Sequence, residues 1–490
     1  MVTNLSDRTL LITGIVLCVV AAWFTIGYHH PDEHFQIWEF ANYKLGHIPA
    51  SDLPWEFPAK MRPGLQPFLA YSTVNVAQKI GIENPFLHVF LTRLLCGLAA
   101  IWVYWNWCSW LGKDFKHAGS VRWLRIGMLF FWCMPYLHAR FSSENTSAIC
   151  FFGGLLLLLQ QIENQKKRHF WNYVAAGFLL GLSFFFRYQI AFAGIGLAAW
   201  LLFQKKLGLV SWTTLALGVL LAFGLGFAAD FWLYGEWVCP PYNYFATNVL
   251  HSDNRFGTEP WWWYFSETFV ALLPPLSIGL FVFFGLGIWQ KPMHVLTWCL
   301  LPFVSAHLMV EHKEMRFLFP IILPFFFLSV AGWEYFQERY ALKNWMLKTL
   351  RLCLWTNATL LFFWIFLPAK GMVAYSKFLW DWHGKHPESS VFFVKNEPKN
   401  HSPLNTPFYE NPGQTQFSWY TNPLHKNDTT ALQTGDLMFF TDVLNPPPKA
   451  PPGFRLERLF TLYPNWVLRV NINNWQNRTH VWAVYRLEER

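Results

Sequence analysis

The stretch TLLITGIVLCVVAAWFTIGYHHPDEHFQ, residues 9–36, joins a long apolar run directly to a cluster of ionisable side chains. Residues 9–28 carry no charged side chain and are long enough to cross a bilayer as a helix. The run is too long for a removable signal peptide and lacks a small-residue cleavage site, so we expect a retained anchor. Asp32 and Glu33 would then lie where that helix leaves the membrane.

The whole chain has the composition of a polytopic membrane protein. Of its 490 residues, 53% are hydrophobic and only 14% are charged, whereas about a quarter of a soluble protein is charged. Because apolar runs of spanning length recur along the chain, we predict an all-α bundle with about eleven transmembrane helices. The expected spans are 9–28, 86–111, 121–139, 145–161, 170–186, 189–203, 210–229, 265–289, 293–310, 316–335 and 350–368.

The positive charges support this count and give the bundle an orientation. A net charge of +9 would suggest nucleic acid binding in a soluble protein, but here Lys and Arg concentrate in alternate short loops, as the positive-inside rule requires. We therefore expect a cytoplasmic N-terminus and a C-terminal tail on the opposite side. Counting residues 67–81 as a span would break the alternation, so we expect a juxtamembrane or re-entrant helix there.

Residues 371–490 differ in composition from the rest of the chain. Prolines crowd NPPPKAPPGF (445–454), and the runs WVLRVNI (466–472) and HVWAVYRL (480–487) alternate as β-strands do. We predict a small α/β domain on the non-cytoplasmic side. It would follow a transmembrane catalytic domain over residues 1–370, whose first non-cytoplasmic loop is 29–85.

Ionisable side chains gather at the expected non-cytoplasmic ends of the spans. Any one of them could simply snorkel to the interface. Together they indicate a functional site, because acids and bases are expensive there and ordinary topogenic charge avoids that face. The candidates are His30, Asp32, Glu33, His34, Arg140, Glu144, Arg187, Asp230, His312, Lys313, Glu314 and Arg316.

Acids paired with cations at one membrane face suit the removal of a proton while an anion is held. Glycoside hydrolysis usually needs two carboxylates, one of which protonates a poor leaving group. Sugar transfer from a lipid phosphate needs a single carboxylate base, because the phosphate leaves as a stabilised anion that Arg, Lys or His can bind. The candidate residues offer both parts.

Structural interpretations compete with these functional ones. Asp32, which follows Pro31, could cap a short helix with its carboxylate. His30, Asp32 and His34 could also be metal ligands, but their spacing matches no zinc signature, so we expect neither a metal nor another cofactor.

Two further features have an alternative interpretation. Arg187, between two apolar runs, could be a simple turn charge. Trp261, Trp262 and Trp263 in PWWWYFSE could form an interfacial aromatic belt, or they could stack on a sugar.

Four segments together resemble glycosyltransferase family 22, the polytopic mannosyltransferases that use dolichyl-phosphate mannose. They are HPDEHFQIWEF (30–40), DFWLYGEWVCPPYNYFATNVL (230–250), FGTEPWWWYFSETF (256–269) and EHKEMRFLFP (311–320). The resemblance covers roughly residues 10–370. Within the family, residues 230–269 are most similar to the GPI mannosyltransferase III subfamily, of which bacteria also carry homologues.

The resemblance implies a GT-C fold with its active site at the lumenal or periplasmic surface. It implies an inverting transfer from polyprenyl (dolichyl)-phosphate mannose to a lipid-linked glycan such as a GPI precursor. Asp32 would be the catalytic base and Glu33 its neighbour or substitute. The donor phosphate would be bound by Arg187, His312, Lys313 and Arg316, supported by His30, His34, Arg140, Glu144, Asp230 and Glu314. The D-x-D dyad that some other GT-C families carry in loop 1 is missing here.

Two other functions compete with this one. A bacterial cell-envelope glycosyltransferase would share the fold and sit in the inner membrane, whereas a eukaryotic GPI enzyme would sit in the endoplasmic reticulum. A secondary transporter would place its charges near the bilayer midplane in repeated halves. In this chain the acids lie at helix ends on one side, which favours the transferase.

Overall fold

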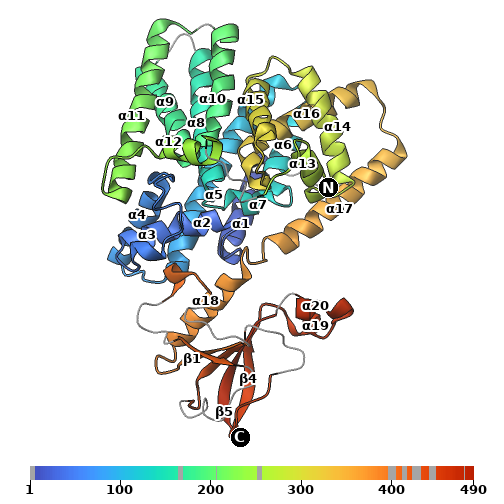
Figure 1. Ribbon diagram of the computed structural model, residues 1–490. Helices are drawn as coiled ribbons and strands as arrows, with labels where there is room; N and C mark the ends of the chain where they lie inside the picture. The colour runs from blue at the N-terminus through green and yellow to red at the C-terminus, as the bar shows by residue number, and fades with distance from the viewer. Residues whose placement is uncertain are drawn as a thin grey trace.

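The computed structural model describes residues 6–163, 169–205, 207–250, 257–395, 404–410, 417–421, 432–440, 448–478 and 481–490. A large helical bundle is joined by one helix, α18, to a small domain built on a β-sheet (Figure 1). The short helices α2 to α4 lie at the end of the bundle that faces this small domain.

In the bundle, each of the eleven predicted spans contains at least one helix, although these helices differ widely in length. Its helices are α1 (Asp7–Phe24), α2 (Pro31–Phe35), α3 (Trp38–Lys44), α4 (Leu65–Lys79), α5 (Pro85–Trp110), α6 (Ala118–Phe130), α7 (Met134–His138), α8 (Ser143–Glu163), α9 (Phe170–Phe186), α10 (Ala191–Trp200), α11 (Leu209–Tyr234), α12 (Pro240–Phe245), α13 (Trp263–Ala271), α14 (Leu276–Gln290), α15 (Val295–Met309), α16 (Ile322–Arg339) and α17 (Asn344–Trp364). Helix α4 covers the segment predicted as a juxtamembrane helix.

Not all of these helices are long enough to be counted as spans. Among the described residues, five helical stretches have the length and apolarity to cross a membrane, and a sixth arises if the pair α14 and α15, bent by 119°, is one span. Helix α9 has only 17 residues, and the predicted span 265–289 is interrupted at Pro274 and Pro275. Proline interrupts a helix because it lacks an N–H and clashes with the preceding turn.

Glycines allow the helices to approach closely where α14 crosses α16. A Cβ atom on Gly287 would lie 1.9 Å from the Leu328 carbonyl oxygen, and one on Gly332 would lie 1.9 Å from that of Phe283. Neither position can accept a side chain unless the two helices separate.

We expect Gly332→Ala to lower the unfolding temperature of the purified protein, because separating the helices should cost about 1–3 kcal/mol. Thermal unfolding in detergent measures this. Gly285→Ala on α14 is the matched control, since a Cβ there would have no atom within 4 Å. Equal unfolding temperatures for the two variants would contradict the packing described.

The small domain holds a mixed five-stranded sheet in the order β2-β1-β3-β5-β4. Its strands are β1 (Val391–Lys395), β2 (Phe417–Thr421), β3 (Leu437–Phe440), β4 (Phe454–Phe460) and β5 (Ala483–Glu489); β1 runs parallel to β2 and β3, and β5 antiparallel to β3 and β4. Helix α18 (Gly371–His383) packs on one face through Tyr375 and Leu379. This agrees with the predicted α/β domain.

One predicted strand is wrong. The run WVLRVNI begins with the short helix α19 (Asn465–Leu468), which Pro464 precedes with extended backbone angles. Four residues of a helical turn can show the same alternation as a short strand, so the pattern alone could not separate them. The other run, HVWAVYRL, contains most of β5.

Candidate active site

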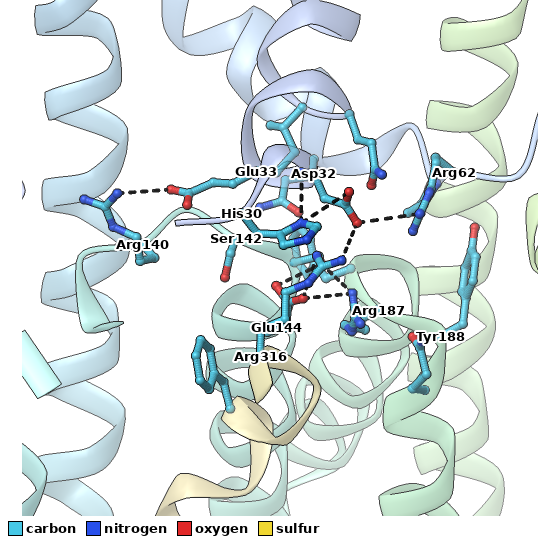
Figure 2. A pocket seen from close by; sticks show the side chains of 18 of the residues that line it. His30, Asp32, Glu33, Arg62, Arg140, Ser142, Glu144, Arg187, Tyr188 and Arg316 are labelled. Carbon is cyan, nitrogen blue, oxygen red and sulfur yellow. Dashed lines mark hydrogen bonds and ion pairs between the residues drawn. The ribbon is translucent and has the colours of Figure 1, made fainter. Parts of the chain in front are cut away.

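A cavity of about 700 Å³, including its open mouth, lies where the connection after α1 meets the ends of the long helices. Its walls come from α2, the loop before α4, the start of α8, the α9–α10 junction, α12 and the 3₁₀ turn Met315–Ile321 before α16. Figure 2 shows the side chains that line it. Seven of the predicted residues line this cavity: His30, Asp32, Glu33, Arg140, Glu144, Arg187 and Arg316.

Helix α2 places Asp32 in the cavity. Pro31 stands at the first helical position, and the His30 ring accepts a hydrogen bond from the Asp32 backbone N–H (3.3 Å), so the cap is the histidine rather than the aspartate. The Asp32 carboxylate is therefore available to other groups. It accepts a hydrogen bond from Arg316 (2.7 Å) and lies 3.6 Å from Arg62 (Figure 2).

The two arginines govern the protonation of Asp32. Burial alone would raise the pKa of this carboxyl, but Arg62, His30 and Arg316 together hold the pKa well below its usual range. A charged partner within hydrogen-bonding distance favours the ionised form of a carboxyl. Asp32 is consequently a carboxylate at neutral pH, able to accept a proton.

A buried carboxylate holds two arginines together beside Asp32. Glu144, at the start of α8, lies 3.0 Å from Arg187 and 3.2 Å from Arg316 (Figure 2). The Arg187 guanidinium also donates to the Ser143 hydroxyl (3.1 Å) and lies over the Phe317 ring. Two cations thus share one carboxylate and face the same cavity, which suits the binding of an anion.

Glu33 points to the other side of α2. Its carboxylate accepts a hydrogen bond from the His29 backbone N–H (2.9 Å) and lies 3.7 Å from Arg140. The Arg140 guanidinium also donates to the carbonyls of Thr25 (2.6 Å) and Gly27 (3.1 Å). Glu33 and Arg140 therefore stabilise the connection between α1 and α2, where Gly27 has a φ of +89°.

Glu314 lies just behind the cavity and orients two of its residues. Its carboxylate accepts a hydrogen bond from Arg316 and lies 3.2 Å from His30 and 2.9 Å from His312. Lys313, the neighbour of Glu314, instead donates to the backbone carbonyls of Glu259 (3.1 Å) and Val310.

Other predicted residues lie away from the cavity. His34 faces Glu39, with Nε2 2.7 Å from Oε1, and Asp230 accepts a hydrogen bond from the Gly64 N–H (2.7 Å). Trp261 and Trp262 are 65% and 51% exposed near the start of α13, which Trp263 begins. None of these five residues lines the cavity.

Several cavity residues were missed by the sequence reasoning. Arg62 is the most important: it lies 3.6 Å from both Asp32 and Glu56, with its guanidinium over the Tyr244 ring. Gln189 donates a hydrogen bond to the Tyr244 hydroxyl (2.5 Å). Arg62 could have been noticed as an arginine on the face that the positive-inside rule leaves poor in basic residues. Further polar residues that line the cavity and were missed include Gln36, Gln66, Ser142, Ser143 and Tyr188.

Within the described part of the chain, no group of three or more His, Cys, Asp and Glu is arranged to hold a metal ion.

Residues 9–387 match the Alg9-like mannosyltransferase family. The chain belongs to this family. All seven predicted residues that line the cavity fall inside the matched region, as does helix α18. The match also extends beyond residue 370, where we expected the catalytic domain to end.

The chain is similar in sequence to GPI mannosyltransferases. The chain is 26% identical over 305 residues to GPI alpha-1,2-mannosyltransferase 3 of Bos taurus, covering 60% of this chain and 53% of that protein. It is 26% identical over 352 residues to GPI mannosyltransferase 3 of Yarrowia lipolytica, covering 70% and 65%. The aligned part of this Alg9-like chain thus spans about half to two thirds of the length of these relatives.

A solved structure shares the fold of this Alg9-like protein. ArnT from Cupriavidus metallidurans, in its crystal structure bound to undecaprenyl phosphate, superposes with a TM-score of 0.53 over 98% of this chain and 97% of that one. The two sequences are 11% identical. The predicted GT-C fold is therefore confirmed, as is the multi-pass membrane architecture.

Proposed function

We propose that this protein transfers mannose from a polyprenyl-phosphate mannose to a hydroxyl of a lipid-linked glycan. The observation that carries the proposal is the ionised carboxylate of Asp32, which faces a cavity that Arg187 and Arg316 also line. Membership of the Alg9-like mannosyltransferase family supports the choice of sugar.

In the proposed reaction Asp32 acts as general base. It takes the proton of the acceptor hydroxyl while the hydroxyl oxygen attacks the anomeric carbon of the donor. The bond from that carbon to the phosphate oxygen breaks on the opposite side, so the configuration inverts. The electron pair leaves with the phosphate, and the proton stays on Asp32 until it passes to solvent.

Arg187 and Arg316 are the proposed ligands of the departing phosphate. Its negative charge grows as the sugar leaves, so fixed guanidinium groups stabilise the transition state more than the ground state. Of the other two cations predicted for this role, His312 pairs with Glu314 and Lys313 is bonded to backbone carbonyls. They support the turn before Arg316 in this proposal.

We propose that the lipid chain of the donor lies next to Arg187. A largely apolar pocket of about 550 Å³, including its open side, lies between α8, α9, α10 and α11. Ser183 and Phe184 line this pocket, and the following residues Phe186 and Arg187 line the polar cavity. A polyprenyl phosphate bound with its head at Arg187 could therefore lay its chain in this pocket. The ArnT structure has undecaprenyl phosphate bound.

In the proposed membrane arrangement, all eleven predicted ranges cross or enter the bilayer and the N-terminus is cytoplasmic. The cavity and the C-terminal domain, residues 371–490, then lie on the lumenal or periplasmic side.

The likeness to GPI mannosyltransferases favours a GPI precursor as acceptor and the endoplasmic reticulum as location. A bacterial cell-envelope glycan in the inner membrane is the second candidate. The exposed Trp261 and Trp262 are proposed to contact the lipid interface or the acceptor sugar.

The direct test incubates the purified protein with short-chain polyprenyl-phosphate mannose and a panel of lipid-linked glycans, followed by mass analysis of the products. Polyprenyl-phosphate glucose is the control donor. We expect a gain of one hexose with the mannose donor, and a dimannosyl GPI precursor among the acceptors would identify the subfamily. Substrate flux in proteoliposomes without sugar transfer would instead support a transporter.

We expect Arg62→Met to move the acidic limb of the activity profile to higher pH. Arg62 helps to hold the pKa of Asp32 well below its usual range, so its removal raises that pKa and the base is protonated sooner as the pH falls. The pH dependence of kcat/KM measures the shift. Lys79→Met, on the exposed end of α4, is the control. An unchanged acidic limb would mean that Arg62 does not tune the base.

A further inference from the structure

Helix α2, which carries Asp32, is too short to fix its own orientation. It has five residues, and its end is closed by the hydrogen bond from the Gln36 N–H to the Asp32 carbonyl (3.2 Å). A single helical turn is unstable by itself. Contacts from the rest of the protein must therefore hold the Asp32 carboxylate in the cavity.

Part of that support comes from residues 404–410, far away in the sequence. The Tyr409 ring lies between two rings, stacked on His34 of α2 (5.4 Å between centroids, 9° between planes) and on Phe86 of α5 (4.7 Å, 19°). Tyr409 is 3% exposed and His34 is 1% exposed. The ring thus fills the space between the short helix and the bundle.

The backbone of the same segment forms a hydrogen bond with a side chain of loop 1. The Phe408 N–H donates to the Glu39 carboxylate (3.0 Å), and the same oxygen of Glu39 lies 2.7 Å from His34 Nε2. The Phe408 ring packs against Trp38 with 4.9 Å between centroids. Glu39 therefore joins the C-terminal segment to the residue two positions after Asp32.

The segment is itself hydrogen-bonded to helix α18 of the C-terminal domain. Thr406, which is fully buried, shares a hydrogen bond with Ser376 of α18 (3.2 Å). The chain just before α18 is bonded to the connection between α1 and α2: Ala369 and Lys370 donate to the Ile26 carbonyl at 2.8 and 3.2 Å. The C-terminal region thus contacts the α1–α2 connection and α2 itself. Figure 1 shows α18 meeting the bundle on this side.

We propose that the Leu404–Glu410 segment is a latch, in which Tyr409 and Glu39 are positioning residues that hold α2 so that Asp32 faces the cavity. This inference rests on the proposed function only for its effect on the rate. The latch itself is a set of contacts that couples residues 404–410 to α2, whatever reaction the protein catalyses. It gives the C-terminal domain a part in the reaction without placing any of its residues in the cavity.

Hydrogen–deuterium exchange of peptides covering residues 29–40 tests the latch by a measurement that does not depend on enzymatic activity. We expect faster exchange there in Tyr409→Ala, with α8 unchanged. Tyr409→Phe keeps the stacked ring and should exchange as the wild type does. Tyr485→Ala is the matched control, because Tyr485 is also a buried tyrosine of the C-terminal domain but packs on Phe440 in the sheet.

Kinetics on the same variants test the consequence for catalysis. Tyr409→Ala should lower kcat at least tenfold with little change in the KM for the lipid donor, and Tyr409→Phe should restore it. Unchanged exchange over residues 29–40 in Tyr409→Ala, or an equal effect of Tyr485→Ala, would overturn the latch. A wild-type protein without mannosyl transfer would refute the proposed function, and the exchange experiment would still decide the latch.

Discussion

Asp32→Asn is expected to reduce mannosyl transfer by about 10²–10⁴-fold, the contribution of a well-placed general base. Asparagine has the shape of aspartate and can still accept the hydrogen bond from Arg316, but it cannot take a proton from the acceptor. The loss should therefore fall on kcat, with the KM of the lipid donor little changed. Initial rates with purified donor and acceptor, over a range of each, measure both constants.

Two further variants make this result specific. Asp52→Asn removes another carboxylate from loop 1. Because Asp52 is exposed, we expect this substitution to leave the rate of transfer unchanged. Glu33→Gln removes the neighbour of Asp32, whose carboxylate is bonded to the His29 backbone and faces Arg140. We expect it to lower stability more than the intrinsic rate. Near-normal transfer by Asp32→Asn, together with a large loss in Glu33→Gln, would assign the base to Glu33 instead.

The sequence predicted the helical ranges well because burial in a membrane requires long apolar runs. It predicted the spans less well, since prolines at 274 and 275 and the short helix α9 alter lengths that hydropathy alone cannot resolve. The small domain was predicted only in outline. Its strands pair residues that are distant in the chain, such as Val391 with Phe417 and Leu437, and no local pattern encodes that pairing.

Some residues of the cavity could likewise be predicted from the sequence, and others could not. Asp32, Glu144, Arg187 and Arg316 were identifiable because each is an ionisable residue at the end of an apolar run. His34 was grouped with Asp32 by adjacency, but residues two apart on a helix point about 200° away from one another. It consequently faces Glu39 and Tyr409 and not the cavity.

Arg62 and Tyr244 illustrate the opposite failure. Arg62 stands out only as an arginine on a face that is poor in basic residues, and nothing in its local sequence pairs it with Asp32 or Tyr244. The folding of loop 1 against α12 brings Arg62 within 3.6 Å of Asp32 and places its guanidinium over the Tyr244 ring. The hydrogen bond from Asn243 to the Lys60 carbonyl (3.0 Å) is part of that contact. Long-range contacts of this kind are invisible in one sequence.

Arg187→Met is expected to lower kcat/KM for the lipid donor by about 10²–10³-fold, the usual effect of removing one preorganised donor to a developing anion. Methionine fills the space of the arginine stem without its charge. Glu144 would keep Arg316 as a partner at 3.2 Å, so its carboxylate would not be left buried without a cation. The protein should therefore remain folded, and thermal unfolding in detergent checks this.

Arg187→Lys separates the charge from the geometry of the guanidinium. Lysine restores one positive charge but cannot contact Glu144 and a phosphate with two parallel N–H groups. We expect activity between those of Arg187→Met and the wild type, with the deficit largest at low donor concentration. Lys205→Met, at the far end of the α10 segment and exposed, is the charge-matched control. If Arg187→Met bound and used the donor as the wild type does, Arg187 would not be a phosphate ligand, and Arg316 and Arg62 would have to hold the phosphate without it. The direction of attack on the sugar relative to Asp32 would then need to be reassigned.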